Sequence, residues 1–491
     1  MPRKEVFRTF SFSLLLIVPG ICLTAEKVVM PPQRLDAPQS SSGAQVAPTP
    51  PKNLADVLHR NRYVIQPVQT QMPVADIRIN TDSDSPTAWT LDDAMTATLT
   101  SDPHLHIGKA EISEARADLL TASLIPNPTL TFAGEAFPYS NRDLELEGGP
   151  PAFIAEVEIP LDWFLFAKRA AETRSARLEV HQTQAEYADL VRQRITETAT
   201  AFYDVLEAKA LLIVARQDLE ILEKIEAATQ KAVEAGGLPG VELDRIRLEL
   251  FKSRQELLEA ESELTIAKAM LWAQFGRIDR DPAFDIRGNL DALMTAQPYP
   301  LDEAFILARQ NRPDIRALRI QVNKAKADTV VEKRNAYPEV TMALGHLREF
   351  HKQAPGPDWE PQEISNGWGV GLTMTVPLFD RNQGNRARAW ATLAKSSHKL
   401  RAGLIDLQAE VEEADQLFRT AHQKATTFAQ EEVRLAIKVR DSIIKSYEVG
   451  GSPLIDVLDT ERTYRETYRL YIASRADYWR ALYLYNGTIG R

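Results

Sequence analysis

The sequence has a single cysteine, Cys22, among its 491 residues. An intrachain disulfide is therefore impossible, which excludes the disulfide-stapled scaffolds of small secreted proteins. Positive charge is also in deficit, because 58 Lys and Arg face 68 Asp and Glu, for a formal net charge of -10. Without a basic block to displace counterions from phosphates, the chain is not expected to bind nucleic acid.

Long apolar runs and catalytic motifs are scarce as well. Beyond the N-terminus no stretch of about eighteen apolar residues occurs, so a membrane role would have to use strands. The sequence contains no Walker loop, no His-Glu-x-x-His motif and no nucleophile elbow. His104 and His106 are two residues apart, a spacing that does not place both on one helix face. We therefore expect no enzyme activity, no cofactor and no metal site.

The N-terminus has the layout of a secretory signal peptide. Basic residues precede an apolar stretch at residues 14–18, and small residues follow it near Ala25. Residues 1–25 are predicted to direct export and to be removed, and Cys22 would either leave with them or carry a lipid after cleavage. Residues 26–88 are rich in Pro and Ser, which predicts a disordered leader.

The rest of the chain consists of two similar halves. Leu-Asp-Asp-Ala at residues 91–94 returns as Leu-Asp-Glu-Ala at residues 301–304, an offset of about 210 residues. Later matches at similar offsets pair Pro103 with Pro313, Pro128 with Pro338, Pro239 with Pro453 and Gly276 with Gly490. These matches predict a unit duplicated in tandem, with a first repeat at 89–277, a linker at 278–298 and a second repeat at 299–491.

Each repeat ends in a long segment of helix-forming residues that is interrupted once. The interruption in residues 162–276 is a Gly-Gly pair followed by Pro239, and the one in residues 380–490 is a Gly-Gly pair followed by Pro453. Both segments are predicted to be antiparallel helical hairpins, because glycine adopts the left-handed backbone of a tight turn at low cost. The first arm of the first hairpin, about 70 residues, would be roughly 100 Å long.

A segment with a period of two precedes each hairpin, at about 128–160 and about 338–377. Residues 368–376, for example, alternate apolar side chains with Gly and Thr, which predicts a strand. In total we expect four strands in two β-hairpins. Their length and alternation suit an outer-membrane sheet, although a soluble sheet with one buried face has the same pattern. Open edges are not tolerated in lipid, so several chains would have to combine.

At this point the sequence resembles the TolC family of outer-membrane efflux proteins, from Leu91 to Arg491. The matching features are Leu-x-x-Ala with Pro-x-Leu at 91–105, Pro-Asn-Pro at 126–128, a Pro-Leu pair after each strand hairpin, Tyr-Glu-Val-Gly at 447–450, Ile-Asp-Val-Leu-Asp at 455–459 and the terminal Gly-Arg. Within the family, the Pro-Asn-Pro motif and the overall pattern are most similar to the heavy-metal branch of CzcC-like channels.

The resemblance implies a fold and a function. The fold would be mainly α with a transmembrane β part: a homotrimer in which four strands per chain form a twelve-stranded β-barrel joined to a long periplasmic α-helical barrel. The function would be a passive exit channel in outer-membrane lipid, served by a periplasmic adaptor (membrane fusion protein) and an RND-type inner-membrane pump. Its cargo would be heavy-metal cations or small toxic compounds.

The resemblance also implies roles for particular residues at the hairpin tips. The tips and their adaptor-docking surface would contain Gly236, Gly237, Gly450 and Gly451, the pore constriction Asp456 and Asp459, and the gate contacts Tyr447 and Glu242. Ser452 stands where some members have an arginine, so the gate would be held differently here. Without the resemblance, two acids three residues apart on a helix would be interpreted as ordinary solvent-exposed side chains.

Two other classes of function stay open on the sequence alone. One is an exported coiled-coil scaffold of the cell envelope without channel activity. The other is an exported enzyme with an unrecognised site, for which no convergent group of acids, bases or metal ligands is evident.

Overall fold

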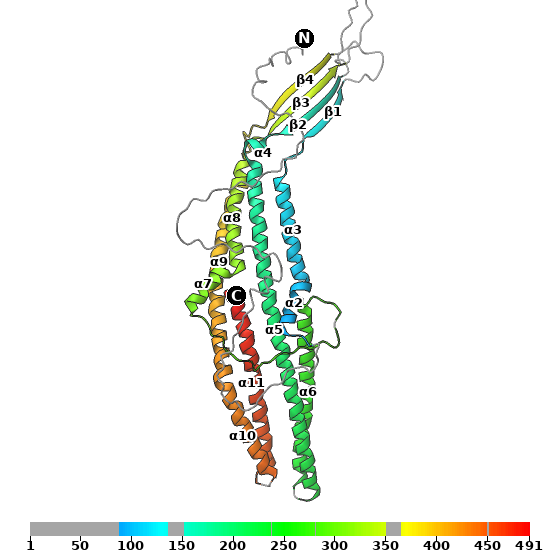
Figure 1. The fold of residues 1–491 in the computed structure, drawn as a ribbon, viewed down its shortest axis with the longest axis vertical. Helices are drawn as coiled ribbons and strands as arrows, with labels where there is room; N and C mark the ends of the chain where they lie inside the picture. The colour runs from blue at the N-terminus through cyan, green and yellow to red at the C-terminus, as the bar shows by residue number, and fades with distance from the viewer. Residues whose placement is uncertain (1–87, 136–151, 237, 280, 350–364, 449–450) are drawn as a thin grey trace, which may run out of the picture. The chain divides into compact units, whose positions relative to one another are not determined.

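The structure is a computed structural model that describes residues 88–135, 152–236, 238–279, 281–349, 365–448 and 451–491. These residues divide into two compact units, a sheet unit that contains the strands and a helical unit that contains the helices (Figure 1). The expected signal peptide, Cys22 and nearly all of the expected leader lie outside the described residues.

The sheet unit is one antiparallel sheet of four strands in the order β1-β2-β3-β4. The strands are β1 (Thr129–Glu135), β2 (Ala152–Pro160), β3 (Val340–Glu349) and β4 (Ser365–Met374). The first repeat supplies β1 and β2, the second supplies β3 and β4, and the two repeats meet where β2 pairs with β3. In that ladder Val157 lies opposite Leu344, and Glu156 lies opposite Gly345.

The register places the exposed large apolar side chains on one face of the sheet, where His346 and Arg348 also lie, because paired residues share a face and successive residues alternate. One face carries Thr, Gly and the carboxylates of Glu156 and Glu158. The other carries exposed large apolar side chains from all four strands: Leu130, Phe132, Phe153, Ile159, Leu344, Trp368, Val370, Leu372 and Met374. The sheet therefore buries neither face within the described unit.

The helical unit contains the two helical hairpins and the shorter helices that precede the strands. Its α-helices are α2 (Leu91–Ser101), α3 (Pro103–Ser123), α4 (Asp162–Leu165), α5 (Lys168–Glu234), α6 (Gly240–Gln274), α7 (Leu301–Asn311), α8 (Pro313–Arg334), α9 (Gln383–Gln423), α10 (Ala429–Glu448) and α11 (Leu454–Ile489). Among the described helices, none combines the length and the hydropathy needed to cross a lipid bilayer.

The other helices pack side by side along α5, and different helices contact its two halves (Figure 1). Its N-terminal half lies between α3 and α8, and α9 packs against α8. Its C-terminal half lies between α6 and α11, and α10 follows α11. The main core is aromatic at its centre, where Tyr203 of α5 stacks on Trp479 of α11 with ring centroids 5.7 Å apart.

The first arm of the second hairpin is not one continuous α-helix. A π-helical turn at Lys424–Phe428 separates α9 from α10, whereas α5, the corresponding arm of the first hairpin, is unbroken over 67 residues. The composition of residues 380–490 indicated only a hairpin, because a π turn inserts one residue without changing the helix-forming composition. The second hairpin therefore has a π-helical turn, a feature at which helices commonly kink, and the corresponding arm of the first hairpin has none.

The two hairpins end in the same way, on a glycine that closes against the start of a preceding helix. Gly276 follows α6 with a φ of 63°, and Gly490 follows α11 with a φ of 75°. A Cβ on Gly276 would overlap Pro103 and lie 2.9 Å from the Ser101 carbonyl oxygen. At Gly490 a Cβ would lie 2.9 Å from the Cβ of Asn311. Both the left-handed backbone and the close approach require glycine.

We expect Gly276→Ala to destabilise the helical unit by at least about 2 kcal/mol, because the methyl group meets both an unfavourable φ and a steric overlap. Gly240→Ala is the matched control, since no atom lies within 4 Å of a Cβ built there. That change should be neutral or stabilising by up to about 1 kcal/mol. Chemical denaturation followed by far-UV circular dichroism measures both effects, and equal stability of the two variants would contradict the assignment.

Candidate functional site at the tips of the helical hairpins

The turn of the first hairpin uses glycine and proline in sequence. α5 ends at Glu234, and Gly236 adopts a φ of 75° while its N–H donates to the Val233 carbonyl at 3.0 Å. No atom lies within 4 Å of a Cβ built on Gly236, so the requirement for glycine there is purely conformational. Pro239 is the N-cap residue of α6. Gly237 lies outside the described residues.

The turn of the second hairpin is closed by a serine pair. The Gly451 N–H donates to the Ser446 carbonyl at 2.7 Å, and the Ser452 hydroxyl donates to the Ser446 hydroxyl at 2.6 Å. Pro453 caps α11 as Pro239 caps α6. Ser452 therefore stabilises its own turn. Gly450 lies outside the described residues.

Asp456 and Asp459 both lie near the start of α11 and are exposed in the single chain. They flank Leu454 and Val457, which are buried against the first hairpin, so the two carboxylates are on the helix face that points away from that core. Within the described part of the chain, neither carboxylate forms an ion pair. A carboxylate in the first turn also stabilises a helix N-terminus, so the position of Asp456 suits a structural role as well.

Tyr447 and Glu242 make different kinds of contact. The Tyr447 hydroxyl lies 3.1 Å from the Thr229 hydroxyl, so it joins α10 of the second hairpin to α5 of the first. Glu242 pairs instead with Arg245 of its own helix at 3.0 Å. Among the described residues no hydrogen bond joins Tyr447 to Glu242. The structure thus brings one of the two expected gate residues to the boundary between the hairpins.

Four helices converge in a small apolar core behind the tips. Its buried members are Leu222 and Ile225 of α5, Ile246 and Leu250 of α6, and Leu454 and Val457 of α11. Ile443, Ile444 and Tyr447 of α10 pack against them. This tip core, as we call these residues, holds the second hairpin against the first.

A buried ion network lies next to the tip core along α11. Arg465 donates to Glu249 at 3.0 Å and to Glu256 at 3.1 Å, and its guanidinium lies 3.2 Å from Asp218. The Ser253 hydroxyl donates to Asp218 at 3.0 Å. Burial raises the pKa of Asp218 although Arg465 opposes that rise. Arg465 of the second repeat is thus bound by three carboxylates of the first.

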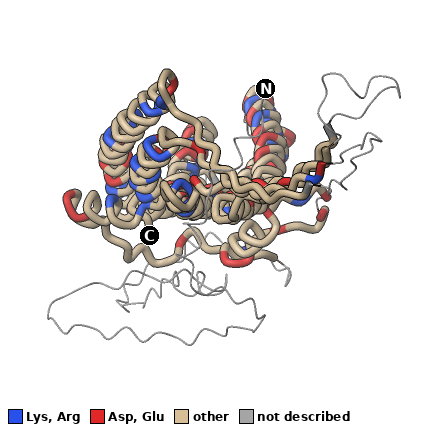
Figure 2. The backbone as a smooth tube through the Cα atoms, turned by 90° about the horizontal axis from the view of Figure 1, so that it is seen from above, with Lys and Arg blue, Asp and Glu red and all other residues tan. Residues whose placement is uncertain are grey.

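Sequence reasoning did not find Arg465 or Asp218. Asp218 lies on an otherwise apolar face of α5, and a charged residue at such a position is the only signal that the sequence offers. Arg465 has Glu461 and Arg469 one turn away on α11, so its helix face offers no such signal. Basic and acidic residues are interspersed in the helices (Figure 2), so this signal does not stand out by composition. Their pairing depends on which turns of α5 and α11 meet.

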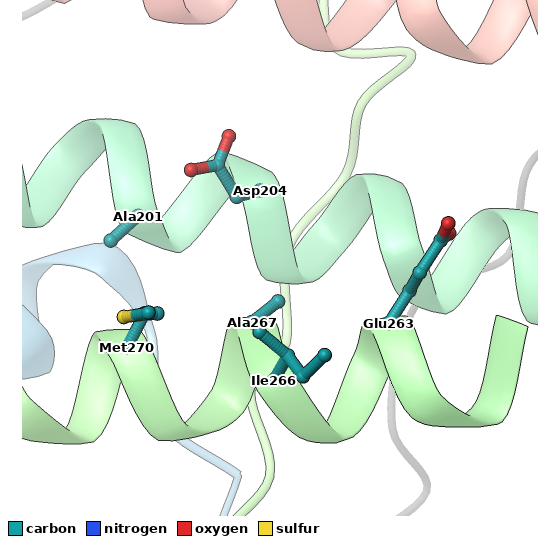
Figure 3. A pocket seen from close by; sticks show the side chains of 6 residues that line it. All are labelled: Ala201, Asp204, Glu263, Ile266, Ala267 and Met270. Carbon is teal, nitrogen blue, oxygen red and sulfur yellow. The ribbon is translucent and has the colours of Figure 1, made fainter. Parts of the chain in front are cut away.

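A shallow groove of the helical unit lies between α5 and α6. It is lined by Ala201, Asp204, Glu263, Ile266, Ala267 and Met270 (Figure 3). Its lining is mainly apolar, with Asp204 and Glu263 as the charged residues. No three His, Cys, Asp or Glu side chains within the described ranges are grouped so that they could hold a metal ion. His104 and His106 are exposed on either side of the buried Leu105.

A long helical hairpin in each repeat, together with a four-stranded sheet that exposes apolar side chains on one face, is the fold of an outer-membrane efflux protein. Residues 95–277 and 306–484 match the family described as outer membrane efflux protein, and the chain belongs to this family. The two matched segments fall within the two repeats that the sequence indicated. The resemblance to TolC-type channels is thereby confirmed.

Individual relatives support the same assignment. The chain is 26% identical over 403 residues to the cobalt-zinc-cadmium resistance protein CzcC of Cupriavidus metallidurans, which covers 82% of this chain and 90% of that protein. It is 22% identical over 389 residues to the pyoverdine export outer membrane protein OpmQ of Pseudomonas aeruginosa, covering 76% and 79%. Among solved structures, CusC has a TM-score of 0.68 at 17% identity, covering 85% of this chain and 96% of that one.

We expect Arg465→Met to destabilise the helical unit by about 3 to 5 kcal/mol, because it leaves buried carboxylates without their cation. The matched control is Arg462→Met, one turn away on the same helix, where the exposed guanidinium is 3.8 Å from Glu249. Loss of that pair should cost less than about 1 kcal/mol. Denaturant unfolding of both variants in detergent decides the point, and equal midpoints would show that the network is not structurally important.

Proposed function

We propose that the protein works as a homotrimeric exit channel in a tripartite efflux system, together with a periplasmic adaptor and an RND-type inner-membrane pump. It is an outer-membrane efflux protein with its helical part in the periplasm. The observation that carries the proposal is the sheet unit, which exposes apolar side chains on one face and polar ones on the other. Such a sheet suits lipid on one side and water on the other.

The sheet also supports the proposal of several copies. β1 and β4 are the edge strands of the described sheet, and unpaired backbone N–H and C=O groups are not tolerated in lipid. Pairing β1 of one copy with β4 of the next would satisfy both edges. Three copies, the number that the resemblance implies, would close a cylinder of twelve strands.

The helical unit offers a second surface for assembly. α6 carries exposed apolar side chains at the spacing of one helix face, and the groove of Figure 3 lies beside them. They are Val241, Leu248, Phe251, Leu258, Ile266 and Met270. α6 is at one side of the helix layer, whereas α10 with exposed Leu435 and Val439 is at the other. Two different edges suit head-to-tail contacts that close into a ring.

In such a ring the hairpin tips would form the periplasmic mouth. Asp456 and Asp459 of three copies would supply six carboxylates to a constriction that favours cations. Tyr447 would hold that mouth closed through Thr229, and Glu242 would contribute from the first hairpin. Gly236, Gly237, Gly450 and Gly451 would shape the surface on which the adaptor docks.

The proposed cargo is heavy-metal cations, with small toxic compounds as the second candidate. The acidic residues support cations: Glu156 and Glu158 lie on the polar face of the sheet, and no Lys or Arg of the described strands shares that face. The name of CzcC supports metal resistance, whereas that of OpmQ indicates that relatives export organic molecules as well. The channel would be passive, and the pump would select the cargo.

Replacing Leu372 with Arg should reduce insertion into the outer membrane, because a charge near the middle of the lipid layer costs about 2 to 4 kcal/mol. Thr373→Arg is the control on the opposite face of the same strand and should assemble nearly normally. The amount of each variant in the outer-membrane fraction measures the difference. Equal losses would contradict the assignment of the lipid-facing side.

Single-channel recording in planar bilayers tests both the channel and its constriction. The wild-type trimer should conduct and prefer cations. Asp456→Asn combined with Asp459→Asn should lower the cation-to-anion permeability ratio several-fold and weaken block by a trivalent cation, because six carboxylates are lost. Asp92→Asn, at an exposed acid of α2, serves as the control. Absence of any conductance would refute the channel, whereas unchanged selectivity would only remove the two aspartates from the pore.

A further inference from the structure

Glu461 of α11 is a buried carboxylate without a partner. Glu461 is 1% exposed, and neither of its carboxylate oxygens forms a hydrogen bond within the described part of the chain. It lies one helical turn beyond Val457 and Leu458 of the tip core and one turn before Arg465. An ionised carboxylate in such a position loses its hydration and gains no hydrogen bond in return.

Two arginines lie near Glu461, but both are engaged elsewhere. Arg465 is held by Asp218 of α5 and by Glu249 and Glu256 of α6. Arg440 of α10 donates from Nη2 to Asp441 at 2.9 Å, and its guanidinium lies 4.1 Å from the ring centroid of Tyr464.

The charged groups that act on Glu461 include Asp218 of α5, Arg440 and Asp441 of α10, and Arg465 of α11. Burial raises the pKa of Glu461 to about 7, against the opposing effect of Arg440 and Arg465 and with the support of Asp218 and Asp441. The side chain therefore changes charge near neutral pH.

We propose that Glu461 is a proton-controlled latch between the two hairpins, which rests on the proposed channel function. When neutral, it stays buried and keeps α10 and the start of α11 against α5. When ionised, it favours an arrangement in which this part of the second hairpin separates from the first and its carboxylate reaches water or Arg440. The π-helical turn at Lys424–Phe428 supplies the bend that such a movement of α10 needs.

The sign of the pH effect follows from the two ionisation states. An exposed glutamate titrates at 4.5 and the buried Glu461 at about 7, so below pH 4.5 both arrangements are protonated and pH exerts no bias. Between these values only the separated arrangement is ionised, so the closed arrangement loses stability as pH rises through this window. Above about pH 7 both arrangements are ionised, and the loss of stability of the closed arrangement has reached its full size. Acidification thus closes the mouth and alkaline pH favours its opening.

Hydrogen–deuterium exchange of trimers in detergent measures the separation directly. After correction for intrinsic exchange rates, amides of α10 should exchange faster at about pH 8.5 than at about pH 5.5, by up to about 30-fold from the two pKa values. Glu461→Gln and Glu461→Met should both exchange slowly at either pH. Glu466→Gln, at an exposed acid on the same helix, is the matched control and should behave as wild type.

Two outcomes would overturn the latch: wild-type exchange that is independent of pH, or an equal pH response in the Glu461 variants. The measurement does not depend on conductance. If the exchange responds to pH only when Glu461 is present but the protein forms no pores, the latch is retained and the channel is refuted. If the trimers conduct but their exchange does not respond to pH, the channel is retained and the latch is refuted.

Discussion

The packing of α11 against α5 is the interaction on which the helical unit depends, because it joins the C-terminal helix of the second repeat to the longest helix of the first. Arginines of α11 reach acids of α5 at two levels, Arg480 to Asp204 at 2.7 Å and Arg465 to Asp218 at 3.2 Å. The spacing of the arginines nearly equals that of the acids, as antiparallel helices require. Tyr203 stacks on Trp479 next to the first of these levels. Together these contacts set the register of the two hairpins.

Duplication supplied two similar hairpins, yet they differ in two structural features. Both close on a left-handed glycine that lies against the start of an earlier helix, and both turn on glycine followed by proline. Only the second has a π-helical turn in its longer arm, and only the second presents Glu461 to the junction of four helices. In the proposed latch the first hairpin would be the support and the second the arm that bends. The bend and the uncompensated carboxylate lie on the same hairpin.

The single chain exposes apolar surface that water disfavours on both of its units. The sheet does so on one face, and α6 does so along one side of the helix layer. Large exposed apolar surfaces of this kind mark contacts with lipid or with other chains. Lipid suits the sheet face because every strand contributes to it, and a neighbouring copy suits α6 because its spacing is that of a helix-packing face. In the proposed trimer a neighbouring copy would cover the α6 face, and lipid would cover the apolar face of the sheet.

Much of this architecture could be predicted from residues that act locally. Glycine and proline mark the tips and strict alternation marks the strands, because these signals depend on backbone preference or on neighbours within a few residues. The repeated motifs reveal the duplication by comparison of the two halves. The π turn and the partners of Arg465 could not be predicted in this way, and neither could the isolation of Glu461. Arg465 meets Asp218 across nearly 250 residues of sequence. Within the described part of the chain the carboxylate of Glu461 forms no hydrogen bond, and the arginines near it pair with other acids. The sequence by itself determined the elements and their order, whereas the tertiary structure decided which charges meet, because that depends on the register of helices far apart in the chain.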